Sequence, residues 1–176
     1  MIFKETILKG GWLIDPERHE DERGFFARIY CREEFERYGL DPHIAQSNTS
    51  FNHTKGTLRG MHYQAPPDEE AKLVRCTQGA IYDVIVDLRT ESPTCLQWTA
   101  VELTAGNRSM LFIPAGMAHG FLTLAPNTEV AYQMSSAQSP DAARGCRWDD
   151  PAFDISWPAP PTVISERDES YPDYQI

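Results

Sequence analysis

The stretch Gly56-Thr57-Leu58-Arg59-Gly60-Met61-His62-Tyr63-Gln64 decides the fold, read together with Ile113-Pro114-Ala115-Gly116-Met117-Ala118-His119-Gly120-Phe121. Each stretch places a histidine, His62 or His119, next to glycines, whose backbone can turn sharply or approach another strand closely. Both stretches lie at the edges of short runs with the residue pattern of β-strands. The two histidines are therefore the first candidates for a functional site.

The spacing of the two stretches resembles the two halves of a cupin metal motif, G-x5-H-x-H followed by P-x-G-x2-H. Gln64 stands where the first half has its second histidine, and an amide is a poor replacement for a histidine ligand. His62, His119 and Glu70 could in principle supply three ligands. The replacement of a histidine ligand by Gln64 instead favours a β-barrel whose cavity catalyses proton transfer. We therefore expect neither a metal nor any other cofactor.

Short runs with strand character follow one another at spacings of about ten residues, with turn signals between them. Strands at this spacing without long helices predict an all-β fold, an antiparallel sandwich or barrel. One helix is expected over 32–39, because acidic residues occupy its first turn and Gly39 suits its C-terminal cap. The tail from Trp157 onward is rich in proline and is expected to be irregular. The expected strands are 24–30, 72–76, 81–88, 96–103, 110–113, 120–124 and 129–134.

Composition narrows the range of partners. A chain of 176 residues suits a single domain, and we expect residues 1–176 to form one. The formal net charge of −10 argues against nucleic acid, which needs a broad basic surface, although a local arginine cluster could still bind one small phosphorylated ligand. No apolar run is long enough to span a membrane.

The cysteines and the N-terminus predict a cytoplasmic protein. The start of the chain lacks the basic and apolar regions of a signal peptide. The four cysteines contain no C-x2-C pair and fit no zinc site, so we expect reduced thiols. They are Cys31, Cys76, Cys95 and Cys146.

Strand alternation places Gly60, His62 and Gln64 on one face, and three polar or small positions suggest a lined cavity rather than a packed core. His119 follows a tight Pro-x-Gly turn, so it is either a turn histidine bonded to backbone or a second cavity residue. Lys72 is either an edge lysine that protects the sheet or a cation that stabilises a developing oxyanion.

Tyr132 alternates with apolar neighbours, which alone suggests a core aromatic, but its hydroxyl could also deliver a proton. Arg23 and Arg59 could clamp phosphate, because the guanidinium fork matches its oxygens. By themselves they are equally compatible with ordinary surface arginines.

Eight segments spread over nearly the whole chain carry a resemblance to one family: 21–26, 46–50, 56–64, 72–76, 83–89, 92–94, 113–121 and 147–151. In these segments the chain resembles the dTDP-4-dehydrorhamnose 3,5-epimerases, metal-free cupin enzymes of nucleotide-sugar biosynthesis. The resemblance implies a cupin-type jelly roll and a nucleoside-diphosphate 4-keto-6-deoxy-hexose as substrate. The 4-keto group makes the protons on C3 and C5 removable.

The resemblance also implies the catalytic residues. His62 matches the family's base, and Asp168 in Ser165-Glu166-Arg167-Asp168 matches the carboxylate that orients it. Lys72 matches the lysine that stabilises the enolate oxygen. Tyr132 matches the acid that returns a proton on the opposite face of the sugar.

The remaining implied residues bind the substrate. By resemblance, Arg23 and Arg59 hold the diphosphate, and His119 faces the sugar or the diphosphate. Phe25, Gln46 and Asn48 line the nucleotide pocket. Family members are usually dimers that exchange N-terminal strands, so we expect a homodimer whose Pro-rich tail packs on the barrel. The six residues are Arg23, Phe25, Gln46, Asn48, Arg59 and His119.

Two departures from the family pattern fall on the nucleotide pocket. The family typically has a glutamate at the position of Arg28, and a Tyr-Tyr pair at the positions of Ala137 and Gln138. A ring of that pair stacks on thymine. The chain therefore either prefers another nucleotide, such as a CDP or GDP sugar, or stacks the base on another aromatic ring, Tyr63 or Tyr171.

Several activities remain open from the sequence. The leading interpretation is a 3,5-epimerase, and close alternatives are a 3-epimerase, a 5-epimerase or a 3,4-ketoisomerase of the same fold. A cupin that binds a sugar nucleotide without catalysis is a different class, and a metal-dependent cupin dioxygenase or isomerase is a third. An opposed base and acid favour catalysis, because a binding module needs neither.

Overall fold

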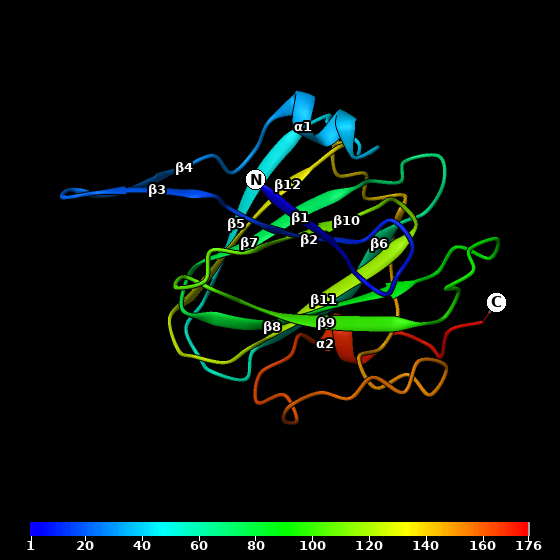
Figure 1. Ribbon diagram of the computed structural model, residues 1–176. Helices are drawn as coiled ribbons and strands as arrows, with labels where there is room; N and C mark the ends of the chain where they lie inside the picture. Colours follow the sequence, from blue (N-terminus) through cyan, green and yellow to red (C-terminus); the bar gives the residue numbers. More distant parts are fainter. Residues whose placement is uncertain (176) are drawn as a thin grey trace.

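Two antiparallel sheets face each other across the protein core in the computed structural model, which describes residues 1–175 (Figure 1). The six-stranded sheet has the order β1 (Ile2–Glu5), β2 (Trp12–Asp15), β10 (Met110–Ile113), β7 (Lys72–Gln78), β12 (Thr128–Met134) and β5 (Gln46–Asn52). The five-stranded sheet has the order β13 (Ala143–Gly145), β6 (Leu58–Gln64), β11 (Met117–Thr123), β8 (Ala80–Asp87) and β9 (Trp98–Thr104). This architecture confirms the predicted all-β, cupin-type jelly roll.

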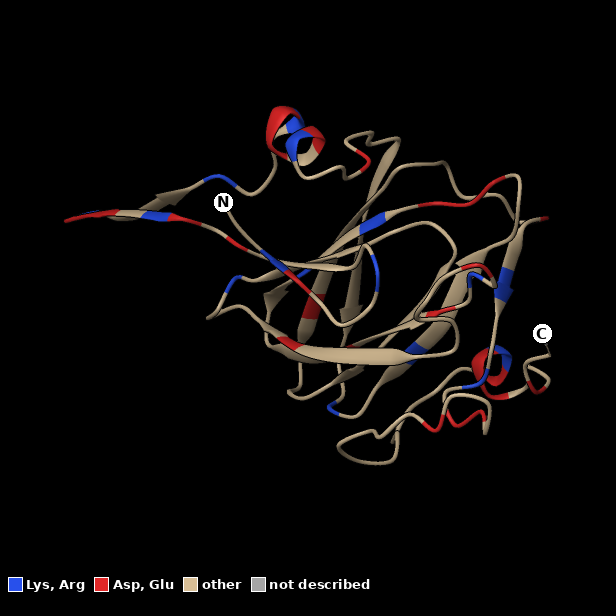
Figure 2. Ribbon diagram, turned by 45° about the vertical axis from the view of Figure 1, so that its right-hand side comes forward, with Lys and Arg blue, Asp and Glu red and all other residues tan. Residues whose placement is uncertain are grey.

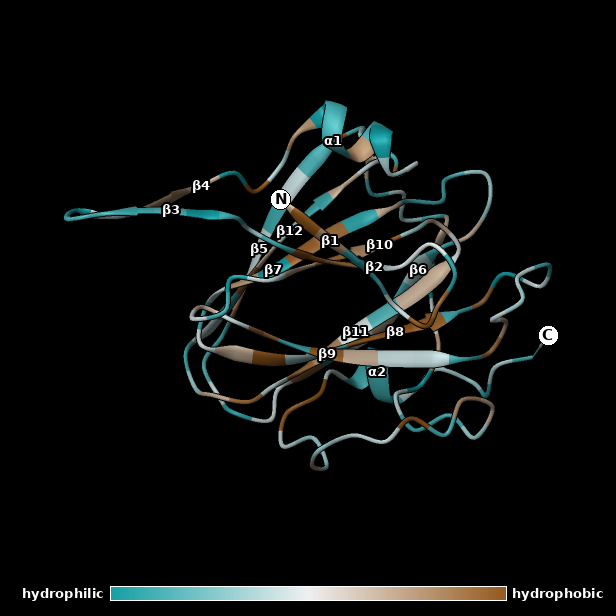
Figure 3. Cartoon of the chain, viewed as in Figure 1, coloured by the Kyte–Doolittle hydropathy of each residue, from teal (hydrophilic) through white to brown (hydrophobic). Residues whose placement is uncertain are grey.

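Strand β8 shows why the sequence builds a sandwich. Ile81 and Ile85 point to the core between the sheets, while Val84 and Val86 pack against the chain that covers the outer face. All four are fully buried, which explains a nearly continuous apolar run instead of simple alternation. Figure 3 shows β8 and β10 in the brown of hydrophobic residues, in contrast with the teal of β3 (Arg18–Asp21).

Each sheet is covered on its outer face by a segment outside the sheets. The six-stranded sheet is covered by helix α1 (Arg32–Arg37), whose Phe35 packs edge-on against Phe3 and Phe112. The five-stranded sheet is covered by the C-terminal tail, whose Phe153 and Trp157 join the cluster on that face. The tail also carries the short helix α2 (Glu166–Glu169). Burial of these apolar side chains fixes the tail on the barrel.

A two-stranded hairpin projects from the body. It consists of β3 and β4 (Gly24–Ala27), and Figure 1 shows it reaching away from both sheets. Phe26 on this hairpin is 73% exposed. The acidic residues at its tip are red in Figure 2. An exposed aromatic side chain on a projecting hairpin is typical of a surface that contacts another molecule.

The structure differs from the predicted elements mainly at boundaries and in polar strands. The helix ends at Arg37, and Gly39 has the left-handed backbone (φ 70°) that its capping role requires. The first predicted strand ends at Ala27 rather than Tyr30. The unpredicted strands are short or polar, so tertiary pairing rather than local pattern defines them. They are β1, β2, β3, β5 and β13.

Neither helix within residues 1–175 is long and apolar enough to cross a membrane. The four cysteines all lie in this described part of the chain and are unpaired.

A buried carboxylate ties together one end of the sandwich. Asp87 at the end of β8 accepts hydrogen bonds from Arg89 (2.8 and 2.7 Å), from Ser92 (2.5 Å) and from Thr94 (2.6 Å). Burial alone would raise the pKa of Asp87, but these hydrogen bonds outweigh it and lower the pKa to about 2.

Asp87→Asn should therefore lower the free energy of unfolding by about 2 kcal/mol at pH 7. Because the folded-state pKa is depressed, the stabilisation is present above the unfolded value of about 3.9 and is lost as pH falls toward about 2. Urea unfolding of wild type and variant at a series of pH values measures this. The exposed Glu91→Gln in the same loop serves as control. A difference that stays constant from pH 7 to pH 2 would contradict the assignment.

Candidate active site

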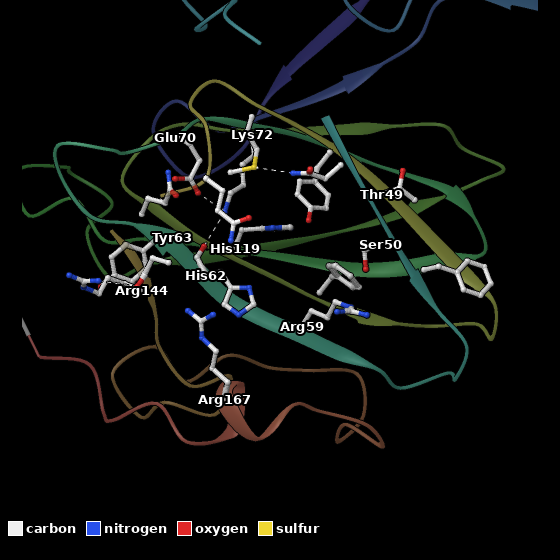
Figure 4. A pocket seen from close by; sticks show the side chains of 18 residues that line it. Thr49, Ser50, Arg59, His62, Tyr63, Glu70, Lys72, His119, Arg144 and Arg167 are labelled. Carbon is white, nitrogen blue, oxygen red and sulfur yellow. Dashed lines mark hydrogen bonds and ion pairs between the residues drawn. The ribbon is translucent and has the colours of Figure 1, made fainter. Parts of the chain in front are cut away.

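A cavity of about 460 Å³ lies between the two sheets and opens to the surface (Figure 4). Both walls contribute polar side chains. His62 on β6 and His119 on β11 come from the five-stranded sheet, whereas Lys72 on β7 and Tyr132 on β12 come from the six-stranded sheet. The fold thus brings four of the predicted residues to one cavity from opposite walls.

A bulge in β6 shapes the five-stranded wall. His62 lies opposite His119, and Arg59 lies opposite Phe121, so two residues of β6 fill the space that one residue of β11 occupies. The bulge lets both Arg59 and His62 line the cavity. The predicted cavity face is confirmed for His62 and Gln64, which both line the cavity, and is wrong for Gly60 because of the bulge.

Gly60 makes the bulge possible. Its φ is 127°, and a Cβ on it would lie 2.4 Å from the Cα of Gly120 on the neighbouring strand. The bulge also turns the Gly60 amide out of the sheet ladder, where it donates to Asp168 Oδ2 (3.2 Å).

His62 and Asp168 form a pair. His62 Nε2 and Asp168 Oδ1 are 2.7 Å apart, although the two residues are separated by 106 positions in sequence. The side chain of His62 is 42% exposed to the cavity, whereas that of Asp168 is only 7% exposed. Burial alone would raise the pKa of Asp168, but the hydrogen bonds from His62 and the Gly60 amide outweigh it and lower the pKa. An ionised carboxylate in this place fixes the ring orientation of the histidine.

His119 belongs to a second pair. Its Nε2 lies 2.7 Å from Oδ1 of Asp83, and both residues are buried. His119 is thus a cavity residue bound to a carboxylate, and the alternative of a turn histidine bonded to backbone is wrong. Sequence reasoning missed Asp83, although an aspartate inside the apolar run of β8 was a usable signal.

Lys72 is buried in the six-stranded wall. Its Nζ lies 3.0 Å from Glu70 Oε1 and donates to the backbone oxygen of His62 (3.3 Å). Strand β7 lies between β10 and β12, so the interpretation of Lys72 as an edge lysine is wrong. Glu70, weighed from the sequence as a metal ligand, is the ion-pair partner of Lys72.

Tyr132 is both a core residue and a cavity residue. It is half-buried against the core cluster between the sheets and also lines the cavity. Its register partners are Asn48 on β5 and Val74 on β7. Asn48 lines the same cavity, so β5 and β12 place a hydroxyl and an amide side by side.

The structure places the other predicted binding residues in two groups. Arg59 lines the cavity, with its Nε bound to Asn52 Oδ1 (2.7 Å), and Gln46 accepts from the Gln138 amide at the cavity rim (2.8 Å). Arg23 and Phe25 do not reach the cavity of their own chain. Both lie on the projecting hairpin, where Arg23 is paired with Asp21 (2.5 Å).

The residues that depart from the family pattern also have defined places. Arg28 pairs with Glu34 of α1 (2.9 Å). Gln138 lines the cavity, and the backbone oxygen of Ala137 accepts from the side chain of Gln64. Of the two alternative aromatic rings, Tyr63 lines the cavity.

Comparison with known proteins agrees with this geometry. The family model described as dTDP-4-dehydrorhamnose 3,5-epimerase matches residues 5–175. The epimerase of that name from Sinorhizobium fredii is 41% identical over 98% of this chain and 89% of its own length. The crystal structure of the Bacillus anthracis epimerase with TDP and PPi bound superposes with a TM-score of 0.94 at 39% identity, covering 98% of this chain and 99% of that one. ChmJ, a 3'-monoepimerase from Streptomyces bikiniensis in complex with dTDP-quinovose, superposes with a TM-score of 0.87 at 34% identity, covering 96% and 85%.

The fold and the residues that line its cavity define a cupin-type isomerase. The match of the family model over almost the whole chain makes the assignment specific. The chain belongs to the dTDP-4-dehydrorhamnose 3,5-epimerase family, which confirms the family and the enzyme class that the sequence predicts.

The ion pair of Lys72 and Glu70 gives a first prediction for the site. The two side chains are only 10% and 3% exposed, and Glu70 Oε2 has no hydrogen-bond partner among the described residues. Lys72→Met should leave the Glu70 charge buried alone and cost about 3–5 kcal/mol of unfolding free energy at pH 7. The double variant Glu70→Gln/Lys72→Met should recover much of that loss. Urea unfolding measures both, and equal losses in the single and double variants would contradict the pairing.

Proposed function

We propose that this chain inverts C3 and C5 of a nucleoside-diphosphate 4-keto-6-deoxy-hexose, converting dTDP-4-dehydro-6-deoxyglucose into dTDP-4-dehydrorhamnose. The observation that carries the proposal is the position of a histidine base and a tyrosine acid on opposite walls of one cavity. Inversion needs one group to remove a proton from one face of the sugar and another to return it on the other face.

In the proposed mechanism His62 is the base. It removes the proton from the carbon next to the 4-keto group, and Asp168 at 2.7 Å stabilises the imidazolium that forms. The depressed pKa of Asp168 supports this role, because the carboxylate stays charged while the histidine gains a proton.

Lys72 and Tyr132 complete the mechanism from the opposite wall. Removal of the proton places negative charge on the 4-oxygen, and the Lys72 ammonium stabilises this enolate. Its buried position supports the role, because a charge interaction is stronger away from water. Tyr132 returns a proton on the face away from His62.

The same cavity offers the substrate its binding groups. Arg59 holds the diphosphate, and His119, fixed by Asp83, faces the sugar or the diphosphate. Gln46 and Asn48 line the nucleotide end.

We further propose a cytoplasmic homodimer in which the N-terminal hairpins are exchanged. Arg23 and Phe25 then reach the diphosphate and the nucleotide in the cavity of the partner protomer. The projecting hairpin and the exposed Phe26 support this arrangement, since both leave apolar surface uncovered in a single chain. Unpaired cysteines are compatible with a reducing compartment.

The identity of the nucleotide depends on which aromatic ring stacks on its base. Tyr63 lines the cavity and supplies a ring for base stacking where Ala137 and Gln138 lack one. Because this ring can replace the stacking that the Tyr-Tyr pair supplies, the departures do not require a change of nucleotide, and we retain the dTDP sugar as the substrate. Binding that is equally tight for dTDP, CDP and GDP would contradict this choice.

A single-site epimerase is the second candidate, because one structural neighbour is a 3'-monoepimerase. Wild-type protein incubated with dTDP-4-keto-6-deoxyglucose in D2O separates the candidates by NMR. We expect deuterium at both C3 and C5. Label at C3 alone would support the monoepimerase, and no label at either carbon would contradict catalysis on this substrate.

A further inference from the structure

Gln64 is the last residue of β6 and stands where the cupin metal motif has a histidine. It lines the cavity, yet only 5% of the residue is exposed. A buried polar side chain costs free energy unless its donors and acceptors find partners, so the bonds of Gln64 indicate what it does. The proposed mechanism gives this side chain no role.

Backbone groups of two separate loops bind both ends of the Gln64 amide. Its Nε2 donates to the backbone oxygens of Asp68 (2.6 Å) and Ala137 (3.4 Å), and its Oε1 accepts from the backbone amide of Ser139 (2.6 Å). Asp68 belongs to the loop between β6 and β7, whereas Ala137 and Ser139 belong to the loop between β12 and β13. Reversing the amide would set one N–H against another, so a single orientation satisfies this network.

Further hydrogen bonds join the same two loops. Ser136 Oγ donates to the backbone oxygen of Glu69 (3.0 Å), and Ser135 Oγ accepts from the backbone amide of Ala71 (2.8 Å). Each of these serines makes one such bond from its hydroxyl, whereas Gln64 makes three and reaches both loops from the buried end of a strand. Hydrogen bonds shielded from water are stronger, so Gln64 is the main side chain that holds the two loops together.

One of the loops that Gln64 holds reaches the nucleotide end of the cavity. Gln138 lies between the two residues of this loop that bind Gln64, and it lines the cavity. The backbone amide of Gln138 donates to Gln46 Oε1 (2.8 Å), and Gln46 is one of the residues proposed to line the nucleotide end. Gln64 therefore fixes the backbone of this loop, and the loop in turn fixes the side chain of Gln46.

We propose that Gln64 is a positioning residue that joins the two loops at the cavity and so preorganises the nucleotide end of the site. The inference rests on the proposed function and extends it to a residue outside the proposed catalytic and substrate-binding set. Preorganisation raises affinity, because a loop that is already ordered does not have to be ordered when the ligand binds. The position that carries a histidine ligand in the cupin metal motif thus serves here to join two loops.

Calorimetric titration of the full chain with dTDP and with inorganic pyrophosphate tests the proposal, since only dTDP has a base to place at the nucleotide end. Gln64→Met keeps the length of the side chain and loses all three hydrogen bonds. It should weaken dTDP binding by about tenfold and leave pyrophosphate binding unchanged, because the loop must then be ordered on binding the nucleotide. Gln78→Met is the matched control and should bind both like wild type. Gln78 ends β7 and donates to the backbone oxygen of Asn127 (2.8 Å), outside the residues that line the cavity.

The outcomes separate the inference from the proposed function. Unchanged dTDP binding in Gln64→Met, or an equal loss for dTDP and pyrophosphate, would overturn the inference even if the protein epimerises sugars. A selective loss of dTDP binding in a protein that exchanges no sugar proton would uphold the inference and remove the proposed function. Wild-type protein that binds pyrophosphate but not dTDP would overturn both. Should Gln64→Met fail to fold, Ser136→Ala cuts another bond between the same loops. A selective loss of dTDP affinity in that variant supports the inference, and unchanged affinity overturns it.

Discussion

The bulge at Gly60 is the constraint on which the rest of the site depends. Only a residue without Cβ can approach Gly120 so closely, and the extra residue turns both Arg59 and His62 toward the cavity. The amide freed by the bulge binds Asp168 and thereby ties the tail to the barrel. The proposed base, its orienting carboxylate and one proposed phosphate-binding arginine therefore all depend on the same bulge.

The two sheets form opposite walls of the cavity, and each wall carries different side chains. The five-stranded wall carries His62 and the His119–Asp83 pair, and the six-stranded wall carries Lys72 and Tyr132. The apolar core between the sheets packs the two walls against each other and so fixes the separation of the side chains that they carry. The tail contributes Asp168, so its docking helps to build the candidate site and does not only cover the outer face.

Sequence reasoning reached the fold class and most of the cavity, and its failures have physical causes. Alternation could not foresee the bulge, because a bulge depends on how Gly60 meets Gly120 on another strand. Lys72 and Glu70 pair because both side chains are buried, and the polar sequence before Lys72 does not reveal that burial. The position of Asp168 was available only through resemblance, since no local pattern brings residues 106 positions apart together. The exchange of N-terminal strands in a dimer was likewise expected only through resemblance, and it stays a prediction.

The central claim is that His62 and Tyr132 act on opposite faces of the sugar. The most direct test compares His62→Ala and Tyr132→Phe with dTDP-4-keto-6-deoxyglucose in D2O, following exchange and inversion separately by NMR. The account predicts that His62→Ala loses exchange by roughly 100-fold or more, whereas Tyr132→Phe still exchanges protons and fails to invert. Small and equal effects of the two substitutions on exchange and inversion would contradict it.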